Sequence, residues 1–166
     1  MPSTYSPNRY DQYLTLKVPV HLVLVMLYIV RHLLIVFLAF NPLPKLAGVF
    51  AFMQPLVSSP VVLLTDIPGF LVLFAWIKRE PDAAPVWRRI WGNGRGLLTT
   101  ALLAHFLFLA LGQGADALHA FNYRYEARLV IVNLGVDLLL IYYLWRFAII
   151  RDVFADFPVA SEKEAR

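Results

Sequence analysis

Six polar side chains interrupt the apolar stretches of this sequence, and five of them are ionisable. They are Arg31, His32, Asp66, His105, Asn133 and Asp137. A charged side chain at the centre of a bilayer costs roughly 2.5–3.5 kcal/mol even on the lenient insertion scale, so such residues usually face one another or a water-filled cavity. The chemistry open to them is ion pairing between helices, or the movement of a proton or polar solute.

The positions of these residues predict that they lie at one depth. Counted from the outer end of each apolar stretch, the ionisable residues lie six to nine positions in, which is about 9–14 Å at 1.5 Å per residue. We expect Arg31 to lie between Asp66 and Asp137, because a guanidinium can bind two carboxylates through separate edges. His32 and His105 would complete the cluster.

Two interpretations of this cluster stay open. In the first, the charges only pin the helices together and replace the hydrophobic force that lipid removes. In the second, they form a proton or ion relay, or a site for a polar substrate. A third and weaker alternative is haem ligated by His32 and His105. We otherwise expect no cofactor, no metal and no catalytic residue, because the sequence has no hydrolase motif.

Four apolar stretches would position these residues, at about 18–40, 60–77, 96–113 and 129–150. Each approaches or reaches the roughly 20 residues that cross a bilayer. In hydrocarbon each stretch must satisfy its own backbone, so the predicted fold class is all-α. Residues 46–59 are apolar but contain Pro55, which favours a short interfacial or re-entrant helix after the first span. The expectation is a polytopic four-transmembrane-helix bundle, with residues 1–166 as a single membrane domain.

The composition supports a membrane protein. Of the 166 residues, 60% are hydrophobic and only 16% are charged, and the mean hydropathy is +0.63, whereas soluble domains carry about a quarter charged residues. The absence of cysteine excludes disulfide, thiol-redox and cysteine–zinc chemistry. The first apolar stretch is longer than the core of a signal peptide and contains Arg31, so we expect it to be a retained transmembrane helix.

The distribution of Lys and Arg predicts the orientation. Ten lie in the N-terminal tail, the loop 78–95 and the C-terminal tail, and three lie in the other two loops. The positive-inside rule then places both termini in the cytoplasm. The polar tail 157–166 is expected to be frayed.

The basic loop 78–95 contains a short helix signal that begins at Pro85. Its apolar residues fall on one narrow stripe, and Gly92-Asn93-Gly94 would end the helix. Such a helix is expected to lie in the membrane interface, with its basic and aromatic residues near lipid headgroups. These residues are Trp87, Arg88, Arg89, Trp91 and Arg95.

Several short motifs carry a resemblance to a known family. They are YDQYLTLKVP at 10–19, YIVRH at 28–32, DIP at 66–68, REP at 79–81, and WRRIWGNGRGLL at 87–98. The chain resembles the YfeZ-like family of small bacterial inner-membrane proteins, a domain of unknown function, over about residues 10–150. The resemblance implies a bacterial inner membrane and four spans. It implies no activity.

The function expected from these features is that of a non-catalytic subunit or accessory protein of a membrane complex rather than that of an enzyme. The alternative is a proton-coupled small transporter or oligomeric channel that uses the Arg/Asp/His cluster. The expected partners are the lipid bilayer and other membrane subunits or further copies of this chain, with no nucleic acid.

Overall fold

The computed structural model describes residues 5–40, 60–122 and 124–158, and these residues are mainly helical. The elements are a 3₁₀ turn η1 (Pro7–Arg9), α1 (Val20–Ile29), α2 (Arg31–Phe40), α4 (Pro60–Ile77), α5 (Pro85–Gly92), α6 (Gly94–Leu109), a π-helical turn η4 (Ala110–Gly114), α7 (Ala115–Ala120), α8 (Tyr125–Arg146) and α9 (Ala148–Ala155). Within the described residues there is no strand, and one isolated bridge joins Tyr10 and Leu16. The all-α prediction is therefore confirmed.

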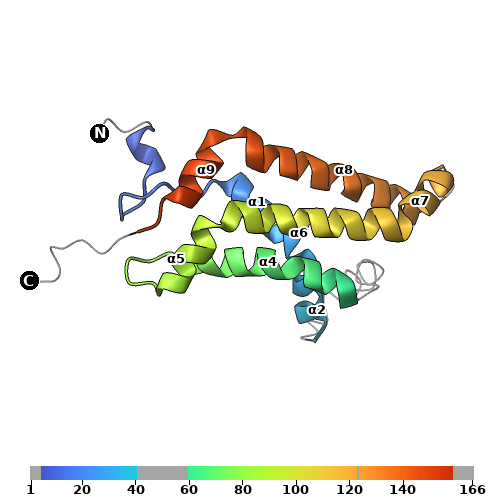
Figure 1. Cartoon of the computed structure of the whole chain (residues 1–166), viewed down its shortest axis with the longest axis horizontal. Coiled ribbons are helices and arrows are strands. Elements are labelled where there is room, and N and C mark those ends of the chain that lie inside the picture. Colours follow the sequence, from blue (N-terminus) through green and yellow to red (C-terminus); the bar gives the residue numbers. More distant parts are fainter. Residues whose placement is uncertain (1–4, 41–59, 123, 159–166) are drawn as a thin grey trace, which may run out of the picture.

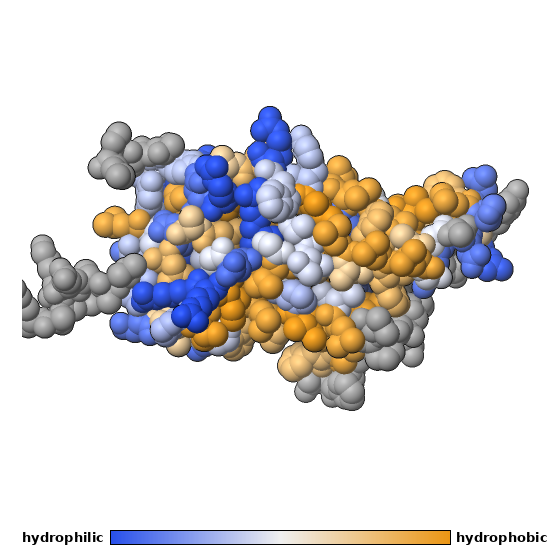
Figure 2. All heavy atoms as spheres, viewed as in Figure 1, coloured by the Kyte–Doolittle hydropathy of each residue, from blue (hydrophilic) through white to orange (hydrophobic). Residues whose placement is uncertain are grey.

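Three long helices form the frame of the molecule. Helix α6 lies between α4 and α8, and α1 lies behind α6 (Figure 1). The buried residues between these helices form an apolar core that includes Leu22, Met26, Val72, Leu98 and Leu144. On the face in Figure 2, hydrophobic side chains cover much of the middle of the helices, and hydrophilic side chains gather at the α5–α9 end and near α7.

Two helical stretches are long and apolar enough to cross a membrane, Gly94–Gly114 and Ala127–Arg146. A third candidate is the pair Val20–Ile29 and Arg31–Phe37, if this bent pair is one span. The helix over Val62–Ile77 is apolar but shorter. The structure thus supplies two or three candidate spans, and the four-span arrangement stays a prediction. The expected interfacial or re-entrant helix at 46–59 lies outside the described residues.

The first predicted span, 18–40, is not one continuous helix. It breaks at Val30, and the two parts are bent by 64°. Neither proline nor glycine lies at the break, which is why the sequence predicted a straight span. Gly69 of α4 faces the last turn of α1 at this level, where a Cβ atom would collide with the side chain of Ile29. The close approach of α4 therefore places its polar residues directly beside the break.

The ends of the last two spans also differ from the prediction. Helix α6 begins at Gly94, two residues early, and continues through η4 into α7. Helix α8 ends at Arg146 rather than at 150, because Phe147 is extended, and the chain restarts as the amphipathic helix α9. The basic loop contains the helix expected at Pro85, which is α5.

The N-terminal loop, residues 5–19, is folded against the last helix. Asp11 accepts hydrogen bonds from the Tyr13 amide at 2.9 Å and from the amide and hydroxyl of Thr15 at 3.0 and 2.7 Å. This tight turn holds Leu14 at a φ of 58°, a left-handed conformation that costs a non-glycine residue roughly 1–2 kcal/mol. The Leu16 amide then donates to the Asp156 carboxylate at 2.7 Å.

Arg79 joins this loop to the end of α9. Its Nη1 donates to the Leu16 carbonyl and its Nη2 to the Asp156 carbonyl, both at 2.9 Å. The Trp91 indole lies at the same end, and its Nε1 donates to the Val153 carbonyl at 2.9 Å. Elements η1, α5 and α9 therefore share one end of the molecule, opposite α7 (Figure 1).

Candidate functional site

The helix break creates unsatisfied backbone groups, and the predicted polar residues satisfy them. The first amides of α2 lack intrahelical acceptors, as at any helix start. Asp66 of α4 supplies the acceptor: its Oδ2 receives the amides of His32 and Leu33, both at 3.1 Å. On the other side of the break, Arg31 Nη1 donates to the Tyr28 carbonyl at 2.8 Å. A negative charge thus lies at the start of α2 and a positive charge at the end of α1, as the helix dipoles favour.

The carboxylates pair with histidines rather than with Arg31. His32 Nδ1 lies 3.1 Å from Asp66 Oδ1, and His105 Nδ1 lies 2.7 Å from Asp137 Oδ2. The expectation that Arg31 bridges Asp66 and Asp137 is therefore wrong. The reason is helix rotation: His32 faces α4 and His105 faces α8, so each imidazole reaches a carboxylate first.

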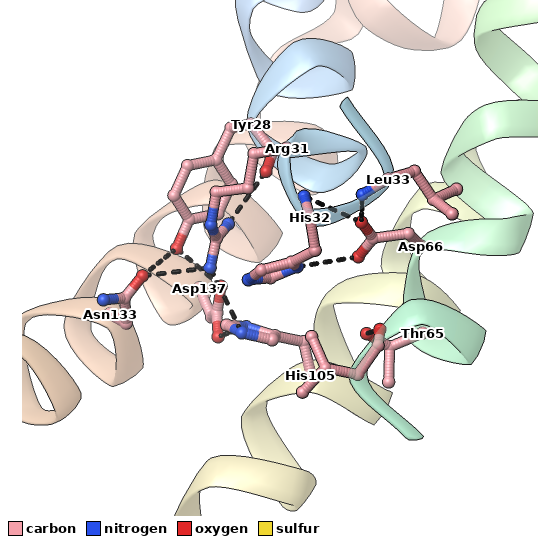
Figure 3. A network of polar contacts seen from close by, with 10 residues as sticks. Tyr28, Arg31, His32, Leu33, Thr65, Asp66, His105, Asn133 and Asp137 are labelled. Carbon is pink, nitrogen blue, oxygen red and sulfur yellow. Dashed lines mark hydrogen bonds and ion pairs between the residues drawn. The ribbon is translucent and has the colours of Figure 1, made fainter. Parts of the chain in front are cut away.

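Arg31 instead binds neutral acceptors between α6 and α8 (Figure 3). Its Nη2 lies 3.1 Å from His105 Nε2 and 3.0 Å from Asn133 Oδ1. The guanidinium carbon also lies 3.9 Å from the centre of the Tyr28 ring, a cation–π contact. Because arginine has only donors, His105 Nε2 accepts, and the ring proton sits on Nδ1, where it is donated to Asp137. His105 therefore lies between the Arg31 guanidinium and the Asp137 carboxylate and contacts both.

Tyr28 is part of the cluster although the sequence did not single it out as a site residue. Its hydroxyl lies 3.1 Å from both Asn133 Oδ1 and Asp137 Oδ1. The spacing Tyr28-x-x-Arg31 places the two side chains on neighbouring turns of the broken segment, which is the signal that could have revealed this role. The structure thus brings all six predicted residues together and adds Tyr28, and we call these seven residues the buried cluster.

Four members of the buried cluster, His32, Asp66, His105 and Asp137, are buried, and the other three are half-buried. Asp66 is 1% exposed, Asp137 is 0% exposed and His32 is 3% exposed. The neighbouring cavity, lined in part by Thr65, Ala101 and Leu102, has a volume of about 10 Å³, which is at the lower limit for one water molecule. Within the described part of the chain, this cavity has no room for a polar solute larger than water.

The two histidines of the haem alternative lie side by side, and haem ligation stays a prediction. The rings of His32 and His105 are 5.3 Å apart and tilted by 37°, and His105 Nε2 already accepts from Arg31. Iron ligation through Nε2 would leave both Nδ1–carboxylate pairs in place but would displace Arg31 from His105. Among the described residues, no group of three or more His, Cys, Asp or Glu is arranged to hold a metal ion.

The residues predicted at the membrane surface separate into two groups. Trp91 was expected near lipid headgroups, and this prediction is wrong: it is 0% exposed and packs on Phe154, with ring centres 4.8 Å apart. The Trp91 end of the stripe on α5 faces protein, because Phe154 of α9 and Arg79 pack on the Trp91 ring, whereas Val86 at the other end is 51% exposed. An apolar stripe in a sequence is expected for a helix that packs on protein as well as for one that lies on lipid.

The other four surface residues are at least partly accessible. Trp87 is half-buried against Phe74, with ring centres 5.3 Å apart, and Arg89 is exposed. Arg88 donates to the Pro81 carbonyl. Arg95 lies over the Trp145 ring at 3.8 Å and donates to the Trp145 carbonyl at 3.2 Å. These four residues can still meet headgroups, and that role stays a prediction.

One family model matches the chain, over residues 5–156, and it describes a protein of unknown function (DUF2919). The chain belongs to this family. The matched region begins at Tyr5 and ends at Asp156, and the structure ties its two ends together: the Tyr5 hydroxyl donates to Asp152 Oδ2 at 2.6 Å, and the Leu16 amide donates to Asp156.

The match also covers every residue of the buried cluster. It attaches no activity to the family and does not test the resemblance to the YfeZ-like proteins. No curated protein and no solved structure matches the chain.

Proposed function

We propose that this protein is a non-catalytic integral membrane subunit or accessory protein, in which the buried cluster holds a broken helix in a fixed shape. The observation that carries the proposal is that Asp66 and Arg31 satisfy the two backbone ends of the break while the cluster encloses only about 10 Å³. In lipid an unsatisfied backbone group costs several kcal/mol, so a break needs such partners. A site that served a substrate would leave room for it.

Exposed apolar faces supply the surface for such a role. Large hydrophobic side chains point outward along α4 and α8, among them Phe70 at 46%, Leu138 at 52% and Trp145 at 58% exposure. In a membrane these faces would meet lipid tails or helices of a partner. We place the chain in a bacterial inner membrane with both termini in the cytoplasm. The excess of Lys and Arg near the α5–α9 end supports this orientation, as does the position of η1 and α9 at one end.

A cross-linking experiment tests the subunit role. A photo-reactive residue at Leu138 is expected to give one discrete cross-linked protein band in native membranes. The same residue at Leu144, which is 0% exposed on the same helix, is the matched control and should give none. If Leu138 gives no protein cross-link, or the same products as Leu144, the protein has no partner on this face.

The second candidate is a proton relay, and one observation favours it. A hydrogen-bonded chain runs from Tyr28 through Asp137 and His105 to Arg31. The His32 ring lies 5.3 Å from the His105 ring, centre to centre. Histidine and carboxylate chains of this kind serve proton pathways in membrane proteins. Such a relay would need the cluster to open, or several copies of the chain to enclose a path.

The aspartates discriminate between the two candidates. With the purified chain in liposomes, the structural role predicts that Asp66→Asn and Asp137→Asn lower the melting temperature and that wild-type protein conducts no protons. Variants that melt like wild type but abolish a measurable proton flux would refute the structural role and establish the relay.

A further inference from the structure

An apolar groove runs along the outside of the bundle between α1 and α8. Both helices pack on α6, and they diverge below the buried cluster, which leaves a hollow of about 460 Å³. Its walls are apolar apart from the ring of His21 and the tyrosine hydroxyls. They include Leu24, Val25, Val136, Leu139 and Leu140.

The groove opens into a second hollow at the end of the molecule that carries η1 and α9. This hollow has a volume of about 610 Å³, and the two share His21 and Tyr143 in their walls. Two cations of the N-terminal loop, Arg9 and Lys17, line it and are exposed. Among the described residues that line either hollow there is no carboxylate. This second hollow, which we call the mouth of the groove, is therefore positively charged, and the groove that continues from it is apolar.

The inner end of the groove is closed by the buried cluster. Tyr28 lines the groove, and its hydroxyl is held by Asn133 and Asp137. From His21 to Tyr28 the groove follows seven residues of α1, which is about 10 Å at 1.5 Å per residue. A linear apolar chain that enters from the hollow lined by Arg9 and Lys17 would lie along α1 and α8 for this length. It would end against the ring of Tyr28.

We propose that these two hollows form a binding site for an anionic phospholipid. The phosphate lies at the mouth between Arg9 and Lys17, and one acyl chain lies in the groove between α1 and α8. The argument is charge complementarity joined to an apolar wall: cations near a membrane surface attract anionic lipid, and each buried methylene adds hydrophobic free energy. The site requires membrane placement but does not depend on whether the buried cluster is structural or a relay.

The test is native mass spectrometry of the full chain released from detergent, titrated with phosphatidylglycerol and, separately, with zwitterionic phosphatidylcholine. We expect wild type to retain one phosphatidylglycerol and to bind phosphatidylcholine at least 10-fold more weakly. Arg9→Gln and Lys17→Gln should each weaken phosphatidylglycerol binding about 5-fold. The control is Lys78→Gln, which removes an exposed charge directly after α4, outside both hollows, and should leave binding unchanged.

A second pair of variants tests the acyl groove. Leu139→Trp narrows the groove and should reduce binding of both lipids, whereas Leu138→Trp changes the neighbouring exposed leucine of α8 outside the groove and should not. Equal binding by all variants would overturn the proposal. If the charge variants weaken phosphatidylglycerol binding but Leu139→Trp does not, the lipid is attracted to the surface without entering the groove. That result would also overturn the proposal. A dimer that Leu139→Trp dissociates would assign the groove to a second copy of the chain instead.

Discussion

Replacing Asp66 with alanine removes the acceptor that caps α2 at the helix break. Three donors lose their partner at once: the amides of His32 and Leu33 and the Nδ1 of His32. Asp66 is 1% exposed, and the adjacent cavity of about 10 Å³ admits at most one water molecule. Water can therefore replace only some of the hydrogen bonds that the carboxylate accepts.

The size of the effect follows from these contacts. A hydrogen bond to a charged group contributes about 1.5–3 kcal/mol, but removing one partner of a buried pair costs about 3–5 kcal/mol in total, since the separate bonds do not add. We therefore expect Asp66→Ala to lower the free energy of unfolding by about 3–5 kcal/mol. For a chain of this length that is a fall of roughly 6–20 °C in Tm. Asp66→Asn retains one acceptor oxygen and should lose about 1–3 kcal/mol.

The assay is thermal unfolding in detergent, followed by circular dichroism, together with amide hydrogen exchange. Asp116→Asn, at an exposed position on α7, removes the same charge and should melt like wild type. In Asp66→Ala the amides of His32 and Leu33 should exchange faster, while those in the middle of α6 stay protected. If Asp66→Ala melts with the control, or exchange at the start of α2 is unchanged, the carboxylate does not stabilise the break.

Three further predictions concern helix packing and the end of the molecule that carries α5 and α9. Gly69→Ala should lower the free energy of unfolding by about 1–3 kcal/mol, because its Cβ would collide with α1. Gly135→Ala on α8, where a Cβ would have nothing within 4 Å, should raise Tm. Changes of the same sign in Tm for both variants would contradict this packing. Trp91→Phe removes the indole donor to the Val153 carbonyl and should cost about 1–3 kcal/mol in denaturant unfolding, so an unchanged midpoint would show that the bond contributes nothing. Burial alone would raise the pKa of Asp11, but hydrogen bonds within its turn and the nearby Arg79 hold that pKa below its ordinary 3.8. A depressed pKa stabilises the fold above pH 3.8 and loses that contribution as the pH falls through the folded value; Asp11→Asn should flatten the acid side of the Tm profile, and an unaltered profile would refute the reasoning.

The gathering of polar residues could be predicted from the sequence because depth is a one-dimensional quantity. Helices that cross from alternate sides place residues at equal counts from one boundary at one level. From that rule the sequence predicted that Asp66, His105 and Asp137 lie close together. Which side chain then pairs with which depends on the rotation of each helix about its axis, and the weak amphipathicity of these apolar segments does not determine it.

The break at Val30 had no sequence signal of the usual kind. Kinks are normally assigned to proline or glycine, and here the cause lies on other helices: Asp66 accepts the freed amides, and Gly69 lets α4 approach. Sequence reasoning also took Trp91 for an interfacial residue, because an apolar stripe packs equally well on lipid or on protein. The turn at Asp11 was readable in principle, since an aspartate followed two and four residues later by amides it can cap is a known turn pattern.

The hydrogen bond between Leu16 and Asp156 links residues 140 positions apart, and this separation affects biogenesis. At roughly 5–20 residues per second of synthesis, the Leu16 amide waits about 7–28 s before its acceptor leaves the ribosome. Arg79 and Trp91 wait for carbonyls of the same late segment. A nascent or truncated chain that ends before α9 therefore leaves these donors without their native acceptors. The N-terminal loop can therefore adopt its final structure only after α9 has been synthesised.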